Sequence, residues 1–322
     1  MPIGFSVLSL KTKNNLQKYL PFLNGKYSTT PGLISMTKIA GESSVVFHID
    51  EHYSTYLKNK ENCRKENIHK YYLEHELPVE TIVAVNRYML WQMSIEYPET
   101  FIYDEQTRSL KNQLTKKEFV INEDFISITG NEYISVFDML CAQLQEDFAI
   151  CCMNEHKDWL AAIHLCAPNY WAAADKIGKP FDAVHAPVPD MEKTKQNYLK
   201  MLLSVIEKGP FTRFAWGIAT DNRLNHHPNA PNGVDEDYWH GRKTNIVNPK
   251  FYLRVERQNL IGFNKLNAFL FSIRTYFYDI NELENEEKKF LLLALETMSA
   301  ATLTYKGLND KMGILRSILI RN

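Results

Sequence analysis

The feature that most constrains the fold is a series of strand-like segments in the second half of the chain, joined without a regular strand–helix–strand repeat. Apolar residues alternate with polar ones, or run together, over 148–153, 159–166, 213–220, 251–258 and 268–278. Strands joined by hairpins or irregular excursions pair antiparallel, because parallel neighbours need a long crossover. We therefore predict an α+β fold built on an antiparallel sheet of about five strands, with helices against one face. The other face of such a sheet can remain for a ligand.

The rest of the chain predicts helices that flank this sheet. They are expected over 50–75, 79–96, 133–146, 171–177, 191–207, 282–298 and 312–320. Short strands are expected at 101–103, 119–121 and 125–127, and a long loop at 221–249. We expect three regions, which are a helical N-terminal region (1–130) packing on the core, a sheet domain (131–280) and C-terminal helices (281–322).

The charge balance and the N-terminus restrict the class of protein. The chain has 37 Lys and Arg against 38 Asp and Glu, a net charge of -1, so we expect no nucleic-acid partner that depends on a dominant basic surface. No basic segment followed by a long apolar one opens the sequence, and no apolar run approaches the ~20 residues that span a bilayer. We therefore expect a cytoplasmic protein without a membrane partner.

The cysteines point to the same compartment. Five are present, and no two have the CxxC spacing of zinc or iron–sulfur sites. We expect buried free thiols, which fit a reducing environment. They are Cys63, Cys141, Cys151, Cys152 and Cys166.

The segment 251–258 places charges of opposite sign on one strand face. Side chains alternate along a strand, so Arg254 and Glu256 point to the same side. Such a pair can hold a propionate, position a polar substrate or transfer a proton, although an ordinary surface salt-bridge ladder has the same pattern. Arg257 falls on the opposite, apolar side, where it needs a partner.

Two neighbouring segments suggest a surface for a flat ligand. In 213–219, Arg213, Ala215 and Gly217 share one face, and small residues let a planar ligand approach the backbone. A closely packed helix on that face is the structural alternative. In 268–276, small residues followed by Arg274 and Tyr276 describe a pocket floor with a polar rim.

His185 lies in a segment that Pro187 and Pro189 stiffen. A rigidly held imidazole with one free nitrogen suits an axial iron ligand, and a hydrogen-bonded structural histidine is the alternative. The histidines and acids of the loop 221–249 lack a recognised ligand spacing.

Seven short blocks together resemble one family, the alpha-subunit-like proteins of heme-dependent oxidative N-demethylase. Their order along the chain agrees with that family, and they span roughly residues 50–280. The blocks are QEDF (145–148), APNYW (167–171), KIG (176–178), HAPVP (185–189), RFAW (213–216), LRVERQ (253–258) and FSIRTY (271–276).

The resemblance implies a PAS-like sheet domain that binds heme b. In the family, the heme iron activates dioxygen, and a small secondary amine such as dimethylamine loses a methyl group as formaldehyde. Electrons come from NADPH through a separate reductase that carries FMN and an iron–sulfur cluster. The expected function is therefore that of a heme-dependent monooxygenase, with the amine, O2 and the reductase as partners.

The resemblance also assigns roles to individual residues. It implies that His185 is the axial iron ligand and that Glu256 orients the amine or carries its proton. The other catalytic candidates are Arg254 and Tyr276, of which Tyr276 would close the pocket. The remaining cofactor-binding candidates are Arg213, Trp216, Arg257 and Arg274.

Some positions depart from the family pattern. Asn259, Gly262 and Phe263 differ in the stretch after the LRVERQ block, and Ala215 stands where the family has Asn. A non-catalytic heme-binding PAS-like sensor and a cofactor-free scaffold therefore stay as alternatives, since a fold does not fix a function.

Overall fold

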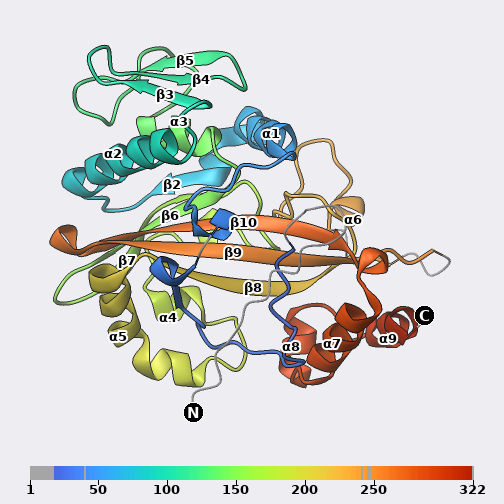
Figure 1. Cartoon of the computed structure of the whole chain (residues 1–322). Coiled ribbons are helices and arrows are strands. Elements are labelled where there is room, and N and C mark those ends of the chain that lie inside the picture. Colours follow the sequence, from blue (N-terminus) through green and yellow to red (C-terminus); the bar gives the residue numbers. More distant parts are fainter. Residues whose placement is uncertain (1–17, 40, 241, 245–247, 321–322) are drawn as a thin grey trace.

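The computed structural model describes residues 18–39, 41–240, 242–244 and 248–320, and these build an α+β molecule around one large antiparallel sheet (Figure 1). The sheet has seven strands in the order β1-β8-β9-β10-β6-β7-β2, and every neighbouring pair is antiparallel. Their bounds are Ile34–Ser35 (β1), Tyr72–Glu74 (β2), Asp147–Met153 (β6), Asp158–His164 (β7), Phe211–Ala219 (β8), Tyr252–Phe263 (β9) and Ala268–Asp279 (β10). The five predicted strands are thus confirmed as β6–β10, and β1 and β2 extend the sheet at its two edges.

A second, three-stranded sheet lies above α2 in Figure 1. It consists of β3 (Phe101–Asp104), β4 (Ser109–Asn112) and β5 (Lys117–Val120). The strand predicted at 125–127 is wrong. Asp124 accepts the backbone N–H groups of Ile126 and Ser127, and Phe125 has a φ of 55°, so the chain turns there.

Nine helices occur in the described part of the chain. They are α1 (Tyr53–Tyr71), α2 (Val79–Glu96), α3 (Val136–Ala142), α4 (Phe181–Val184), α5 (Glu192–Lys208), α6 (Glu236–Trp239), α7 (Asn285–Glu296), α8 (Ala300–Tyr305) and α9 (Met312–Ile320). The bounds of α2 and α9 agree with those predicted, and the segment expected at 171–177 forms a single 3-10 turn, Ala173–Asp175. None of these helices combines the length and the apolarity that crossing a bilayer requires.

The two faces of the large sheet have different coverings. Strand pairing places Arg213, Arg254, Glu256, Gln258 and Thr275 on one face, which we call the Glu256 face. The opposite face, which we call the Arg274 face, carries Trp216, Arg257, Arg274 and Tyr276.

Helices cover both faces, so the prediction that they lie against one face is wrong. On the Glu256 face, α5 packs so closely on β9 that a Cβ at Gly262 would overlap the Ile206 carbonyl. On the Arg274 face, α2 and α3 form one core with Ile261 and Leu270, while α7 and α9 form another with Leu253 and Val255. A sheet covered on both sides exposes only the stretches that the helices leave between them.

A segment over residues 45–50 crosses the Arg274 face and is held by buried carboxylates. Glu96 accepts the N–H groups of Val46 and Phe47, and Glu146 accepts that of His48 at 2.7 Å. Burial raises the pKa of both carboxyl groups. The segment therefore closes this face with hydrogen bonds in addition to apolar packing.

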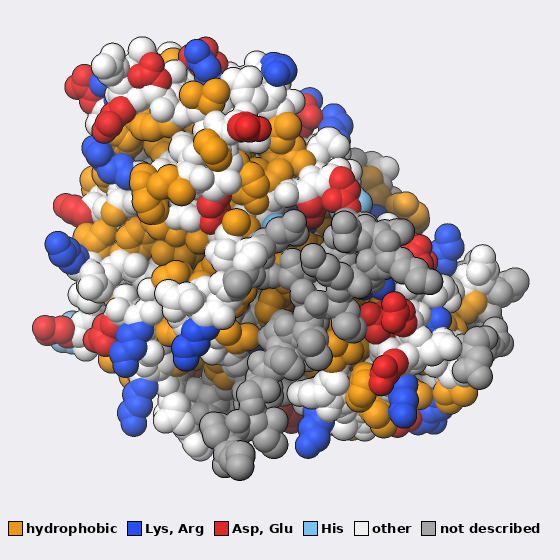
Figure 2. All heavy atoms as spheres, viewed as in Figure 1, with side chains coloured by type: hydrophobic (Ala, Val, Ile, Leu, Met, Phe, Trp, Pro, Cys, Tyr) orange, Lys and Arg blue, Asp and Glu red, His pale blue; other side chains and the backbone are white. Residues whose placement is uncertain are grey.

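An apolar patch lies on the face of the molecule seen in Figure 2. Figure 2 shows hydrophobic side chains gathered at the left, over α2 and the strands beside it. Val79, Trp91 and Ile95 of α2 are each more than half exposed.

Candidate functional site

The Glu256 face brings together the charged pair predicted from strand alternation. Nη2 of Arg254 lies 3.3 Å from Oε1 of Glu256, and Nε2 of Gln258 donates to Oε2 at 3.0 Å. Both carboxylate oxygens therefore have a donor, and both donors come from β9 itself. The exposed fraction is 18% for the Glu256 side chain and 3% for Arg254. This contrast leaves the carboxylate open to a ligand and the guanidinium enclosed.

Arg254 is held in place from two directions. Its Nη2 also donates to the carbonyl of Ala167 at 2.8 Å and to Oγ1 of Thr275 at 3.3 Å. Its Nη1 is buried and makes no hydrogen bond to any residue that the structure describes. A buried donor without an acceptor is costly, which favours an acceptor group from a bound ligand.

Arg213 adds a second cation to this face. It pairs in register with Gln258, so it lies diagonally beside Glu256. Burial lowers the pKa of Arg213, and the charge of Glu256 opposes that shift. The buried Nε of Arg213 also has no hydrogen-bond partner within the described ranges.

His185 follows α4 directly and is fixed by that short helix. Its Nδ1 lies 2.8 Å from the carbonyl of Phe181, and its ring packs against the Phe181 ring at a tilt of 31°, with centroids 4.1 Å apart. Burial lowers the pKa of His185 from 6.5 to about 4, and the charge of Arg213 acts in the same direction. The ring is therefore neutral at pH 7, and the carbonyl assigns its proton to Nδ1.

The remaining nitrogen of His185 is available for a ligand. No described residue hydrogen-bonds to Nε2, so its lone pair is unused. A neutral imidazole whose Nδ1–H is held by a backbone carbonyl is the usual form of a metal-ligating histidine. Since Arg213 lies beside Glu256 on the sheet and its charge also acts on His185, the three side chains belong to one neighbourhood.

Lys306, at the end of α8, is a member of this neighbourhood that the sequence did not suggest. Its Nζ donates to the carbonyl of Trp216 at 2.9 Å and lies 5.2 Å from the ring centroid of Tyr27. Burial lowers the pKa of Lys306 to about 8, against the opposing charge of Glu256. No motif surrounds this lysine, and tertiary folding brings it to Trp216 of β8, 90 positions earlier in the chain.

The other predicted site residues lie on the Arg274 face, away from His185. Nη2 of Arg274 donates to Asp50 at 2.6 Å, and its guanidinium stacks over the rings of Tyr56 and Tyr276. The hydroxyl of Tyr276 bonds to Nδ1 of His48 at 2.7 Å. These side chains are engaged with the N-terminal segments that cover this face.

Two further predicted residues complete the Arg274 face. Nη2 of Arg257 donates to the carbonyl of Val45 at 2.5 Å, which is the partner that its buried position requires. The ring of Trp216 packs in the core with α7 and α9 and meets the ring of Phe22 edge-on. The sheet therefore separates these residues from His185 and Glu256.

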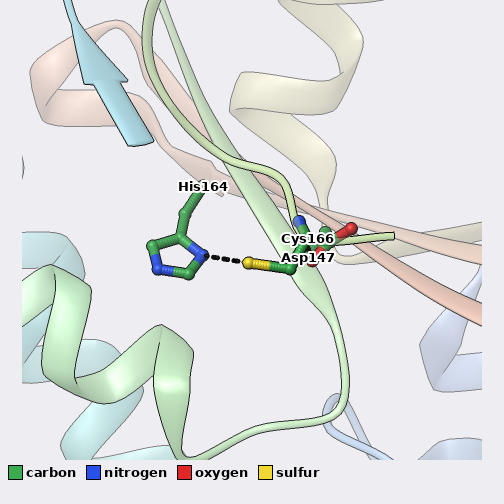
Figure 3. Close-up of side chains that lie close together, drawn as sticks. All are labelled: Asp147, His164 and Cys166. Atoms are coloured by element: carbon green, nitrogen blue, oxygen red, sulfur yellow. Dashed lines mark hydrogen bonds between the residues drawn. The ribbon is translucent and has the colours of Figure 1, made fainter. Parts of the chain in front are cut away.

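Elsewhere in the described part of the chain, one group of ligand-type side chains comes together, Asp147, His164 and Cys166. Figure 3 shows His164 and Cys166 facing each other, with Nδ1 and Sγ 3.9 Å apart. Asp147 already accepts the N–H groups of Cys166 and Ala167, and the amine of Lys60 lies 3.8 Å from it. We interpret this buried group as a structural hydrogen-bond cluster, because its carboxylate is occupied and a cation already adjoins it.

Comparison with known families decides the affiliation of the chain. Residues 37–313 match the model of the family described as haem-dependent oxidative N-demethylase, alpha subunit-like. The chain belongs to this family. The match covers most of the chain and confirms the resemblance that the seven sequence blocks indicated.

The residues on the Glu256 face fit the group that gives the family its name. Three cationic side chains lie around the carboxylate of Glu256, namely Arg213, Arg254 and Lys306. The guanidinium groups of Arg213 and Arg254 each have one buried donor without an acceptor. Heme carries two propionates, which would balance that excess of positive charge. His185 would supply the nitrogen that heme iron requires.

Proposed function

We propose that this protein is a heme-dependent monooxygenase that removes a methyl group from a small secondary amine, using O2 and electrons from a partner reductase. The observation that carries the proposal is the neutral His185 with its unused Nε2, in the same neighbourhood as Glu256. An iron ligand and a partly open carboxylate are the two groups that such chemistry requires of the chain. The family match supports the same reaction class.

The cofactor would be heme b in a PAS-like domain formed by residues 131–280, with 1–130 and 281–322 packed around it. The central strand order β7-β6-β10-β9-β8, in which the first strand of the domain lies between its second and its last, supports the PAS-like comparison. His185 would hold the iron, and Arg213 and Arg254 would hold the propionates. When bound, heme would supply the activation of dioxygen.

Glu256 would handle the amine. A small secondary amine is protonated at neutral pH, so its nitrogen lone pair is unavailable until a base accepts the proton. The carboxylate of Glu256 would bind the ammonium group and take this proton. Arg254 and Gln258 would keep the carboxylate oriented toward the ligand, since each donates to one of its oxygens.

On the Arg274 face, we propose that Arg257, Arg274, Tyr276 and Trp216 support the sheet from behind rather than touch the cofactor. Their hydrogen bonds and packing contacts go to residues 18–56 and to the C-terminal helices. They would fix the position of β9 and β10, and thereby that of Glu256.

The electrons would come from a separate protein that holds FMN and an iron–sulfur cluster. The family description names an alpha subunit, which supports the presence of a partner. A cytoplasmic location would suit this system, and the five free cysteines support a reducing compartment.

The decisive experiment is the absorption spectrum of protein expressed with added heme precursor, recorded oxidised and then reduced. We expect a stoichiometric Soret band that shifts on reduction in the wild type, and a lost or displaced band in His185→Ala. An unchanged spectrum in His185→Ala would overturn the ligand assignment. No band after reconstitution with heme would leave a cofactor-free scaffold as the function.

Turnover then separates an enzyme from a sensor. With a reductase supplied, the wild type should oxidise small secondary amines to formaldehyde, and Glu256→Gln should lower kcat at least 100-fold while it keeps the Soret band. Heme binding without amine oxidation would identify a sensor. Equal turnover by Glu256→Gln would refute the proton role.

A further inference from the structure

The amine of Lys306 occupies a position that suits covalent chemistry. Its side chain crosses the Glu256 face at Gly217, where a Cβ would lie 3.5 Å from Nζ. One N–H of the amine donates to the carbonyl of Trp216, and the side chain is partly exposed. A neutral amine in this place still has its lone pair free for reaction with a ligand.

The groups around Lys306 come from four directions. Glu256 on β9 and Tyr305 on α8 interact with each other electrostatically, and Tyr27 lies over the amine. Arg213 and Arg254 lie on the same sheet face. Burial of the amine lowers its pKa to about 8, against the opposing charge of Glu256, so a larger fraction of Lys306 is neutral near neutral pH than of an exposed lysine.

A cleft lies between Tyr170 and residues of the loop 221–249. It has a volume of about 410 Å³ and is lined by Tyr170, Pro228, Asp237, His240, Arg242 and Lys243. The side chain of Arg242 also packs against Gly307, the residue after Lys306. The cleft and Lys306 are therefore neighbours through Arg242, and the partial exposure of Lys306 itself opens it to a small molecule from solvent.

We propose that Lys306 is a carbonyl-reactive residue that captures a small aldehyde, such as formaldehyde, as a reversible imine. The proposed demethylation would supply the aldehyde, so the biological source of the ligand rests on the proposed function. The covalent reaction itself does not rest on it, because it needs the amine and the aldehyde alone.

The step balances without an oxidant or a reductant. The Nζ lone pair forms a C–N bond to the carbonyl carbon, and the carbonyl π pair moves to oxygen, which gains a proton as the nitrogen loses one. Loss of the hydroxyl group as water then gives the imine, so that amine plus aldehyde become imine plus water. Glu256, on the sheet face that Lys306 crosses, would carry the proton from nitrogen to oxygen, and addition of water reverses the reaction.

Other buried lysines lack this arrangement and provide internal comparisons. Nζ of Lys311 pairs with Asp310 at 2.8 Å. Lys60 donates to the carbonyls of Cys141 and Glu146. Lys60 also lies 3.8 Å from Asp147, so both amines have a carboxylate partner, whereas no described carboxylate forms an ion pair with Lys306.

The test uses the full-length chain without heme. The protein is treated with ¹³C-formaldehyde and sodium cyanoborohydride at pH 7.5, and labelled peptides are followed by mass spectrometry over time. We expect Lys306 to be methylated at least tenfold faster than Lys311, with a rate that rises with pH and reaches half its maximum near pH 8. Equal rates at the two lysines would overturn the proposal.

Two variants complete the test. Lys306→Arg keeps the positive charge and should abolish the fast phase, whereas persistence of that phase would assign it to another lysine. Glu256→Gln should slow labelling at Lys306 at least tenfold and leave Lys311 unchanged, and an unchanged rate would refute the proton transfer. Because heme and reductase are absent, failure here is distinct from failure of the proposed demethylation.

Discussion

The state of His185 depends on burial and on one backbone hydrogen bond. The Phe181 carbonyl fixes the proton on Nδ1, and burial keeps the ring neutral down to about pH 4. A structural histidine is normally bonded through both nitrogens or exposed, whereas this one keeps Nε2 unused. That asymmetry makes His185 the strongest ligand candidate among the residues predicted from sequence.

The lowered pKa of His185 predicts a pH-dependent stability. The unfolded chain binds this proton near pH 6.5 and the folded chain near pH 4, so stability is fully present above pH 6.5 and falls as the pH drops through this window. Between pH 7 and 4.5 this residue should account for a loss of about 2 kcal/mol. In urea unfolding at both pH values, His185→Leu should lose less stability than the wild type by that amount. An identical loss of stability in both proteins would contradict this account. The pKa of His48 is also lowered to about 4, but His48 is present in both proteins and contributes equally to both losses.

Part of this residue-level arrangement could be predicted from the sequence. Strand alternation alone gave the shared face of Arg254 and Glu256, and it also placed Trp216 on the opposite face from Arg213. Lys306 could not be predicted, because its role depends on tertiary contacts with β8 and β9 and not on a local motif. The roles suggested for Arg274 and Tyr276 depended on which face would hold the ligand, and a strand pattern cannot say what covers each face.

At the scale of elements, β9 and β10 separate two sets of buried arginines. Arg254 interacts with the partly open Glu256, while Arg274 is paired with Asp50 and stacked on tyrosines. Both guanidinium groups are almost fully enclosed, yet their surroundings predict different consequences of removal.

Arg254→Met should lower the affinity for heme at least tenfold, because it removes a donor that we assign to a propionate. Arg274→Met should change that affinity less than twofold but lower the free energy of unfolding by about 3 kcal/mol, because it breaks a buried ion pair. Heme titration and urea unfolding measure the two effects. A heme affinity that falls equally in both variants would contradict the separation of the two faces.

The contact between α5 and β9 predicts a second difference. At Gly262 a Cβ would overlap the Ile206 carbonyl, whereas at Gly217 it would make ordinary contact with Lys306. Gly262→Ala should therefore destabilise the protein by about 2 kcal/mol, since α5 must move away from the sheet. Gly217→Ala, the matched control in the neighbouring strand, should stay within about 0.5 kcal/mol of the wild type. Equal unfolding midpoints for the two variants would show that α5 can move away from the sheet without loss of stability.

Several elements could be predicted because their signals are local. Pro78 before an amphipathic run marks the start of α2, and Tyr97-Pro98 marks its end. The strand β4 was missed because Ser109–Asn112 is short and carries one apolar residue. The strand predicted at 125–127 was wrong because the apolar residues there have a strand-like pattern, while the Asp124 side chain holds the backbone in a turn.

At the scale of the whole molecule, two features could not be predicted from patterns along the chain. They are the two edge strands of the sheet and the presence of helices on both of its faces. The edge strand β1 has two residues and β2 has three, which is too short for an alternation to be recognised. The helices on the Arg274 face come from both halves of the chain, and α5 on the Glu256 face comes from between them, so their placement follows from long-range packing.

Binding of heme should stabilise the whole fold. A ligand that binds only the folded state at 100 times its Kd adds about 2.7 kcal/mol, which for a chain of this size raises Tm by about 4 °C. Calorimetry of the wild type with and without heme should show this rise, and His185→Ala at the same heme concentration should not. A rise of equal size in the variant would place the heme elsewhere.

Thr275 joins the two faces of the sheet through a single residue. Its hydroxyl accepts from Arg254 on one side, and its carbonyl accepts from Arg274 and from the Tyr56 hydroxyl. The effects of substitutions at Arg254 and Tyr56 on the free energy of unfolding should therefore be non-additive, although the two side chains lie on opposite faces of the sheet. For anyone redesigning this pocket, the covering layer behind the sheet becomes a second set of positions from which ligand preference can be tuned.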